Sequence, residues 1–219
     1  MPLPMVHLSV ANQIADSGRL NISDLPSFYL GNIAPDAIHM RDGWTYNDKV
    51  ISHLGTRNAL NFSERKDLLD IIAEFVKHIP LGEKRSYFLG YAVHVLADGY
   101  FLEYVYTSFL EKYRADKDKI QEEKPAYYND TDQLDFILFN TNPHREDIWR
   151  ELEISKAYDL EDILYKTEAQ KWKERTLNWY DGVSEYKNPI KYITIDVLRE
   201  FIPKCADLCC EFIEKASEN

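Results

Sequence analysis

The longest helical pattern in the chain, residues 84–114, contains its most apolar stretch, FLGYAVHVLADGYF at residues 88–101. A segment that is apolar on every side predicts a helix buried in the core. The same stretch contains a histidine and an aspartate, His94 and Asp98, four residues apart. A buried charge is costly unless it is paired or bound to a metal ion. The segment therefore predicts a buried helix that contains a polar site.

The rest of the chain also favours helices. Its 219 residues are 45% apolar and include 15 Tyr, 10 Phe and 4 Trp, enough to fill a substantial core. Only eight glycines occur, and long periodic runs dominate. No internal repeat or low-complexity linker divides the sequence. We therefore predict a multi-helix all-α fold in which residues 1–219 form a single metal-binding domain.

Apolar periodicity and helix-start signals place the elements. Ser63 is expected to be one N-cap, and Asn142 another, with Pro143 at the first helical position. Residues 25–44, rich in proline and glycine, predict turns with little regular structure, and the polar residues 115–132 predict a long loop or mobile lid. Helices are predicted at residues 2–16, 63–79, 84–114, about 131–139, from 142 onward, 160–180 and 194–216.

The charge and the ends of the chain restrict its partners. A net charge of −11 argues against a sequence-independent grip on nucleic acid, although a small phosphate ester could still meet a metal ion in a pocket. No segment approaches the roughly 18 apolar residues of a membrane span, and no basic amphipathic anchor is evident. The N-terminus lacks the pattern of a signal peptide. We expect no stable membrane association.

Cys205, Cys209 and Cys210 are an odd number of cysteines at helical spacing. This pattern is typical of reduced thiols in a core and favours a cytoplasmic protein.

His94 and Asp98 lie one helical turn apart on one face. They could give an imidazole nitrogen and a carboxylate oxygen to one cation, or they could simply bond to each other. Gly90 and Ala97 are small, which allows another backbone to approach the helix there.

Further polar residues stand in apolar settings in the first half of the chain. Asp36 follows Pro35 in GNIAPDAIH, and three histidines occur nearby in sequence: His7, His39 and His53. His78 and His144 are flanked by charged or helix-terminal residues and are expected at the surface.

These residues occur in an order that resembles the zinc-dependent phospholipase C superfamily, which includes the single-strand-specific zinc nucleases. The shared features are an early His, a G-x-x-x-P-D turn, a later His, and G-x-x-x-H-x-x-x-D on a buried helix, over roughly residues 5–101. The resemblance implies an all-α fold and a zinc cluster that hydrolyses phosphate esters. It places His7 at a second site that shares Asp98, and leaves His39 as a rival to the favoured His53. It assigns the following residues to one metal site: Asp36, His53, His94 and Asp98.

The chain departs from the family pattern in two places. Secreted members use the amino group of their mature N-terminus as a ligand, and this chain shows no signal to cleave. Members also carry a further His and an H-x-x-x-E/D motif, whereas here Asp98 is followed by Glu103 but no His, and His144 lacks an acid at the right spacing. One or two metal ions are therefore expected rather than three.

Two His and two carboxylates can hold Zn²⁺ with a position open for water, whose pKa falls from about 15.7 toward about 7. Asp36 or Asp98 is expected to act in catalysis by orienting or deprotonating that water. Mn²⁺ or Fe²⁺ would also suit these ligands. The sequence thus predicts a zinc-dependent hydrolase of a small soluble phosphate ester. The alternative is a non-catalytic helical protein with a vestigial or structural metal site.

Other residues have competing interpretations. Arg41 and Arg57 could clamp a phosphate, but surface or salt-bridge roles are favoured. Asp132 and Asp135 could complete a metal site, although acids at a helix N-terminus are the favoured interpretation. A set of tyrosines could stack on a substrate, but core packing explains them more simply. This set is Tyr91, Tyr100, Tyr104 and Tyr106.

Overall fold

A computed structural model describes residues 3–56, 60–182 and 188–218 of the chain. These residues form helices and no strand, apart from an isolated bridge between Leu160 and Leu164. The prediction of an all-α fold is confirmed. Buried apolar side chains from α1 to α10 share one core. The α-helices are α1 Pro4–Ser17, α2 Leu25–Gly31, α3 Tyr46–Ser52, α4 Lys66–Lys77, α5 Arg85–Phe101, α6 Thr107–Ala115, α7 Glu123–Thr141, α8 Arg145–Ile154, α9 Lys166–Asn178 and α10 Ile195–Glu218.

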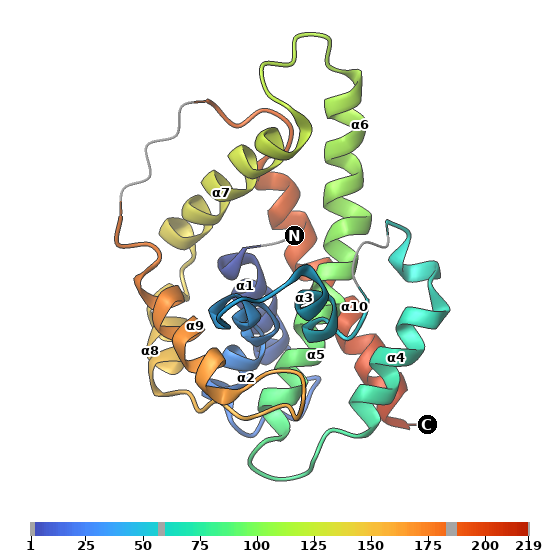
Figure 1. Cartoon of the computed structure of the whole chain (residues 1–219), viewed down its shortest axis with the longest axis vertical. Coiled ribbons are helices and arrows are strands. Elements are labelled where there is room, and N and C mark those ends of the chain that lie inside the picture. Colours follow the sequence, from blue (N-terminus) through green and yellow to red (C-terminus); the bar gives the residue numbers. More distant parts are fainter. Residues whose placement is uncertain (1–2, 57–59, 183–187, 219) are drawn as a thin grey trace.

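Three short helices of other types interrupt this series. The 3₁₀ helices η1 and η2 span Ala34–Met40 and Phe62–Glu64, and a π-helical turn, η3, spans Leu102–Tyr106. Through η3, α5 continues into α6, which projects from the body of the molecule (Figure 1). The predicted helix over residues 84–114 is therefore present, with a π-helical turn one turn after Asp98.

Helix α5 is the centre of the core, because every residue from Ser86 to Phe101 is buried. Helix α2 packs closely against it. A Cβ on Gly31 would overlap the carbonyl oxygen of Tyr87, and a Cβ on Gly90 would overlap that of Phe28. The absence of side chains at these two glycines is what lets the two backbones touch.

The expectation of little regular structure at residues 25–44 is wrong, because this segment contains α2 and η1. Pro26 and Pro35 lie in the first turns of these helices, where a missing N–H breaks no hydrogen bond. Asp24 caps α2 by accepting a hydrogen bond from the Ser27 N–H at 3.2 Å. The prolines therefore mark helix starts rather than loops.

The expected long loop at residues 115–132 is also shorter, because α7 begins at Glu123. Pro125 again lies in a first turn, and Tyr127 packs against Phe109 with ring centroids 5.3 Å apart. The predicted helix at residues 131–139 is therefore the second half of a longer one.

Three predicted helix starts are displaced. Ser63 lies in η2, where its N–H and hydroxyl donate to Glu103, so α4 begins three residues later at Lys66. Asn142 accepts from the His144 N–H at 2.8 Å, and α8 begins at Arg145. The turn closed by Leu160 and Leu164 delays α9 until Lys166.

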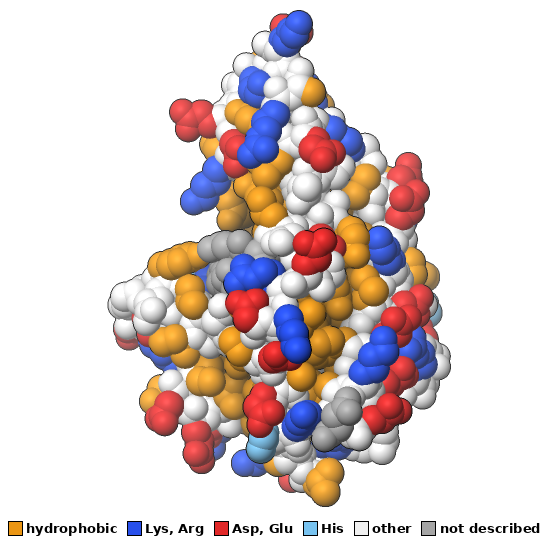
Figure 2. All heavy atoms as spheres, turned by 90° about the vertical axis from the view of Figure 1, so that its right-hand side faces the viewer, with side chains coloured by type: hydrophobic (Ala, Val, Ile, Leu, Met, Phe, Trp, Pro, Cys, Tyr) orange, Lys and Arg blue, Asp and Glu red, His pale blue; other side chains and the backbone are white. Residues whose placement is uncertain are grey.

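Within the described part of the chain, none of the helices combines the length and apolar character that crossing a membrane requires. Cys205, Cys209 and Cys210 are free and buried on α10, as expected for core thiols. On the face shown in Figure 2, basic side chains alternate with acidic ones rather than forming a continuous basic surface.

Candidate metal centre

Residues from four elements meet beside the middle of α5. Asp98 lies among the imidazoles: its Oδ1 is 3.5 Å from His7 Nε2, and its Oδ2 is 3.3 Å from His53 Nε2. His94 Nε2 is 3.9 Å from the same Oδ2. Asp36 Oδ1 lies 3.5 Å from His53 Nε2. The structure therefore brings together every predicted ligand: His7 of α1, Asp36 of η1, His53 at the end of α3, and His94 and Asp98 of α5.

Backbone carbonyls set the orientation of two imidazoles. His94 Nδ1 lies 2.8 Å from the carbonyl oxygen of Asn32, and His53 Nδ1 lies 2.9 Å from that of Lys49. A carbonyl oxygen only accepts, so each Nδ1 donates, and Nε2 of the neutral ring is left as a lone pair. Both Nε2 atoms face the carboxylates and lie 3.4 Å apart.

Among the described side chains of the centre, acceptors outnumber donors. Both oxygens of Asp98 and both ring nitrogens of His7 are buried without a hydrogen-bond partner among the described residues. Burial also lowers the pKa of His94 to about 3, so this ring is neutral at physiological pH. Facing lone pairs and carboxylates repel one another unless a cation lies among them.

A divalent cation fits this arrangement. His7, His94 and Asp98 offer ligand atoms that lie within 4.8 Å of one another, and so do Asp36, His53 and His94. Mixed nitrogen and oxygen donors suit Zn²⁺, and Mn²⁺ or Fe²⁺ accept them as well. The two overlapping groups share His94.

Both carboxylates are ionised at neutral pH. Burial by itself raises the pKa of Asp98, but the surrounding imidazoles of His7, His94 and His53 outweigh it and hold the pKa below its ordinary value. For Asp36 the same balance holds, with the Lys49 ammonium as the main group that lowers the pKa. The two side chains thus bring negative charge to the centre.

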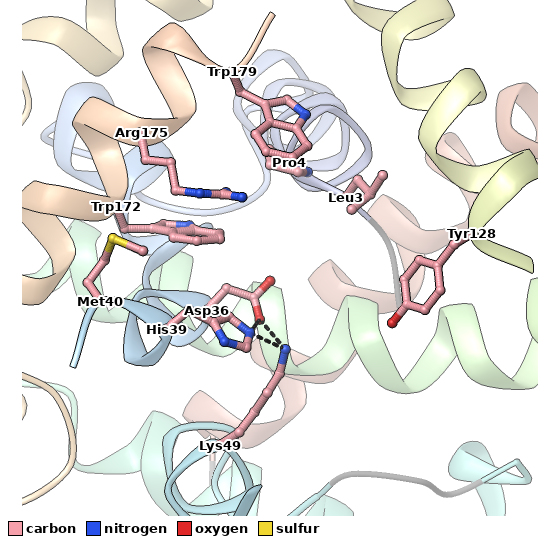
Figure 3. A pocket seen from close by; sticks show the side chains of 10 residues that line it. All are labelled: Leu3, Pro4, Asp36, His39, Met40, Lys49, Tyr128, Trp172, Arg175 and Trp179. Carbon is pink, nitrogen blue, oxygen red and sulfur yellow. Dashed lines mark hydrogen bonds and ion pairs between the residues drawn. The ribbon is translucent and has the colours of Figure 1, made fainter. Parts of the chain in front are cut away.

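Lys49 belongs to the site although the sequence analysis missed it. Its Nζ lies 2.9 Å from Asp36 Oδ1 and 2.8 Å from His39 Nε2 (Figure 3). An ammonium only donates, so His39 Nε2 accepts this hydrogen bond and faces Lys49. His53, in contrast, directs its Nε2 at both carboxylates, which supports it over His39. The spacing in the sequence could have indicated this residue, because Lys49 precedes His53 by four residues, which is one helical turn.

The centre borders a cavity of about 450 Å³ on the side of Asp36. Asp36, His39 and Lys49 line one wall of it, and the opposite wall comes from α9 and its C-cap residue (Figure 3). The residues of that opposite wall are Trp172, Arg175 and Trp179. None of these three was singled out from the sequence, and neither was Tyr128, which also lines the cavity.

Arg41, one of the two arginines considered for phosphate binding, does not line this cavity. Arg41 makes a bidentate pair with Glu168, at 2.7 and 3.1 Å, and donates to the Ile163 carbonyl at 2.9 Å. Arg41 therefore has the salt-bridge role that the sequence favoured over phosphate binding. Its pair with Glu168 joins α9 to the end of η1. Arg57 lies outside the described residues.

The two acids of the segment YYNDTDQLDF lie in the interior of α7, so the favoured interpretation of them as N-terminal acids of their own helix is wrong. Asp135 accepts from the Met5 N–H at 3.0 Å and therefore caps the start of α1 instead. Asp132 is partly buried on the same helix and joins no metal-binding group among the described residues. The interpretation was wrong because the helix was expected to begin at about residue 131, whereas α7 begins eight residues earlier, at Glu123.

The remaining residues that the sequence singled out either make contacts within the fold or lie at the surface. Glu103 accepts from Ser63, and His78 and His144 are exposed. Tyr91 donates to the Ser52 carbonyl, and Tyr106 donates to Glu123. Tyr100 packs on Phe62 and Tyr104, as the core-packing interpretation expects.

The structure is thus that of a helical protein whose buried cluster of imidazoles and carboxylates, beside an open cavity, could hold a metal ion. Residues 6–101 match the family model described as zinc dependent phospholipase C. The predicted resemblance to that superfamily is thereby confirmed. The match spans all the predicted ligands and ends at the last residue of α5. Searches of the curated proteins and of the solved structures found no match to the chain.

Proposed function

We propose that this protein is a zinc-dependent hydrolase of phosphate esters that takes a small substrate into the cavity beside Asp36. The observation that carries the proposal is the buried cluster of imidazoles and carboxylates, in which acceptors outnumber donors, within the segment that matches the family model. The cavity volume of about 450 Å³ is in the range of sites for small molecules. A cytoplasmic location stays a prediction.

The residues that would hold one or two zinc ions are His7, Asp36, His53, His94 and Asp98. A zinc ion bound there supplies a hydroxide at neutral pH and neutralises charge on the phosphoryl oxygens. Asp36 borders both the centre and the cavity, so it is placed to accept a hydrogen bond from the attacking water. Its low pKa suits it to orienting that water rather than to taking a proton outright. Lys49 keeps Asp36 ionised and adds a positive charge to the wall.

The test is a screen of p-nitrophenyl phosphate and bis(p-nitrophenyl) phosphate with zinc added back after chelation. We expect turnover that a chelator abolishes. Asp36→Asn should lower kcat by about 100-fold or more, because it removes a charged ligand and the group that orients water. The control is Asp70→Asn, the same change at an exposed position of α4, which should keep full activity. If the zinc-loaded protein turns over neither ester, a non-catalytic helical protein with a structural metal site replaces this proposal.

A further inference from the structure

Arg175 is held between two tryptophan rings on the cavity wall. Its Cζ lies 4.6 Å from the centroid of Trp172 and 4.3 Å from that of Trp179, one ring on each face (Figure 3). Stacking covers the faces of a guanidinium but leaves its N–H donors, which lie in the plane at the edge. The side chain is therefore fixed with its donors available for a ligand in that plane.

Within the part of the chain that the structure describes, no carboxylate pairs with Arg175 and no acceptor takes a hydrogen bond from it. This differs from Arg41, whose guanidinium is bidentate on Glu168. The chain has 37 acidic residues against 26 basic ones, so an acid partner would not be scarce. A half-buried arginine that keeps its donors free marks a place for an anion.

The charges of the cavity are asymmetric. Among its described lining residues the sole acid is Asp36, which Lys49 already pairs at 2.9 Å. On the proposed function, a zinc ion held by the cluster would neutralise the phosphoryl group on that side. Arg175 lies on the opposite wall, where a different part of the substrate would meet it.

The same arrangement disfavours a cationic head group. The Trp172 and Trp179 faces that could surround an ammonium are already stacked on Arg175. A quaternary ammonium would also face the like charges of Arg175 and Lys49.

We propose that Arg175 binds a second anionic group of the substrate, so that the protein selects phosphate esters that carry a further carboxylate or phosphate. This inference rests on the proposed phosphoester hydrolase. Arg175 acts as a residue of specificity and takes no part in breaking the bond.

The test uses phosphonates, which are not hydrolysed, and measures their binding to the zinc-loaded protein by titration calorimetry. The matched probes are 3-phosphonopropionate, propylphosphonate and 2-aminoethylphosphonate, which differ in an anionic, neutral or cationic end. We expect 3-phosphonopropionate to bind about tenfold more tightly than propylphosphonate, a difference of about 1.4 kcal/mol. We expect 2-aminoethylphosphonate to bind most weakly.

Arg175→Met should remove the preference for 3-phosphonopropionate and leave propylphosphonate within about twofold of the wild type. Arg175→Lys should keep part of the preference, because lysine retains the positive charge but lacks the planar guanidinium. This variant replaces Arg175→Met in the test if the methionine variant does not fold. Arg199→Met, at an exposed arginine of α10 paired with Asp196, is the control. Equal affinities for the three probes, or an Arg175→Met variant that keeps the preference, would overturn the inference. The binding test requires no hydrolysis. A lack of turnover in the ester screen and a lack of selectivity among the phosphonates can therefore be told apart.

Discussion

Hydrogen bonds to backbone carbonyls decide which atom His94 and His53 present to the centre. His94 donates through Nδ1 to the carbonyl oxygen of Asn32, and His53 donates to that of Lys49. Partners of this kind fix the tautomer and the ring orientation of a metal ligand. Asn32 also donates from its side chain to the Gly90 carbonyl at 3.3 Å, so one residue supports the ligand and the helix that carries it.

Asp135 shows what a buried carboxyl does when it has no cation beside it. Burial raises its pKa to about 7, and the hydrogen bonds from Tyr180 and Met5 lower it only in part. An aspartate in an unfolded chain has a pKa of about 3.9. At a pH between these two pKa values, the folded protein keeps a proton on Asp135 that the unfolded chain has released.

We therefore expect this carboxyl to weaken the fold as the pH rises from about 4 through about 7, because the unfolded state then holds fewer protons than the folded state. Relative to Asp135→Asn, the wild type should lose a few kcal/mol of unfolding free energy over this range, at about 1.4 kcal/mol per unit of pKa difference. Urea unfolding at several pH values measures both proteins. Parallel pH curves for the wild type and Asp135→Asn would contradict the expectation.

At the scale of elements, the contact between α2 and α5 positions the centre. Gly31 and Gly90 bring the two backbones together, and Asn32, the C-cap of α2, then reaches His94. The separation of these helices thus determines where the carbonyl that orients His94 lies.

Gly90→Ala should force this contact apart, because the new Cβ would overlap the Phe28 carbonyl and lie 2.9 Å from the Asn32 nitrogen. We expect a destabilisation of about 1–3 kcal/mol from overpacking, despite the better helix propensity of alanine. Zinc affinity should fall as well, because Asn32 moves away from His94. Denaturant unfolding and competitive zinc titration measure the two effects.

Gly182→Ala is the matched control, since a Cβ there meets no atom of the described residues within 4 Å. It should change the stability by less than about 0.5 kcal/mol. A Gly90→Ala protein as stable as this control would show that the two helices can separate without cost.

At the scale of the whole molecule, the proposed ligands join elements that are far apart in sequence, from His7 in α1 to Asp98 in α5. Zinc that binds only the folded protein stabilises it by about 2.7 kcal/mol at 100 times the dissociation constant. We expect zinc to raise the melting temperature of the chelated protein and His94→Ala to abolish most of that rise. His78→Ala, at an exposed histidine, should keep it. An equal zinc-induced rise in both variants would place the metal elsewhere.

The sequence predicted what depends on residue type and short-range spacing. A run that is apolar on every side predicted the burial of α5, and His94 with Asp98 predicted a polar centre inside it. The roles of the ligands stay a prediction, although their proximity supports them. The sequence did not show which carbonyl orients each ring, because Asn32 and His94 meet only through tertiary packing. The prolines of residues 25–44 misled because their place in a first turn depends on where the helix begins.

The α9 wall of the cavity shows the same limit. Trp172, Arg175 and Trp179 follow an ordinary amphipathic spacing along α9, and only the fold shows that they face Asp36. The salt bridge from Arg41 to Glu168 holds that helix in place. Prediction from sequence alone had no means of joining these distant segments.

Since α9 supplies a wall of the cavity but none of the five proposed ligands, the two proposals together would place reactivity and choice of substrate in separate stretches of the gene. Mutation can alter the three wall residues of α9 without touching an atom that would bind zinc. On these proposals, a lineage that keeps the first 101 residues could change its choice of substrate through substitutions in this one segment, because the proposed zinc ligands would stay the same.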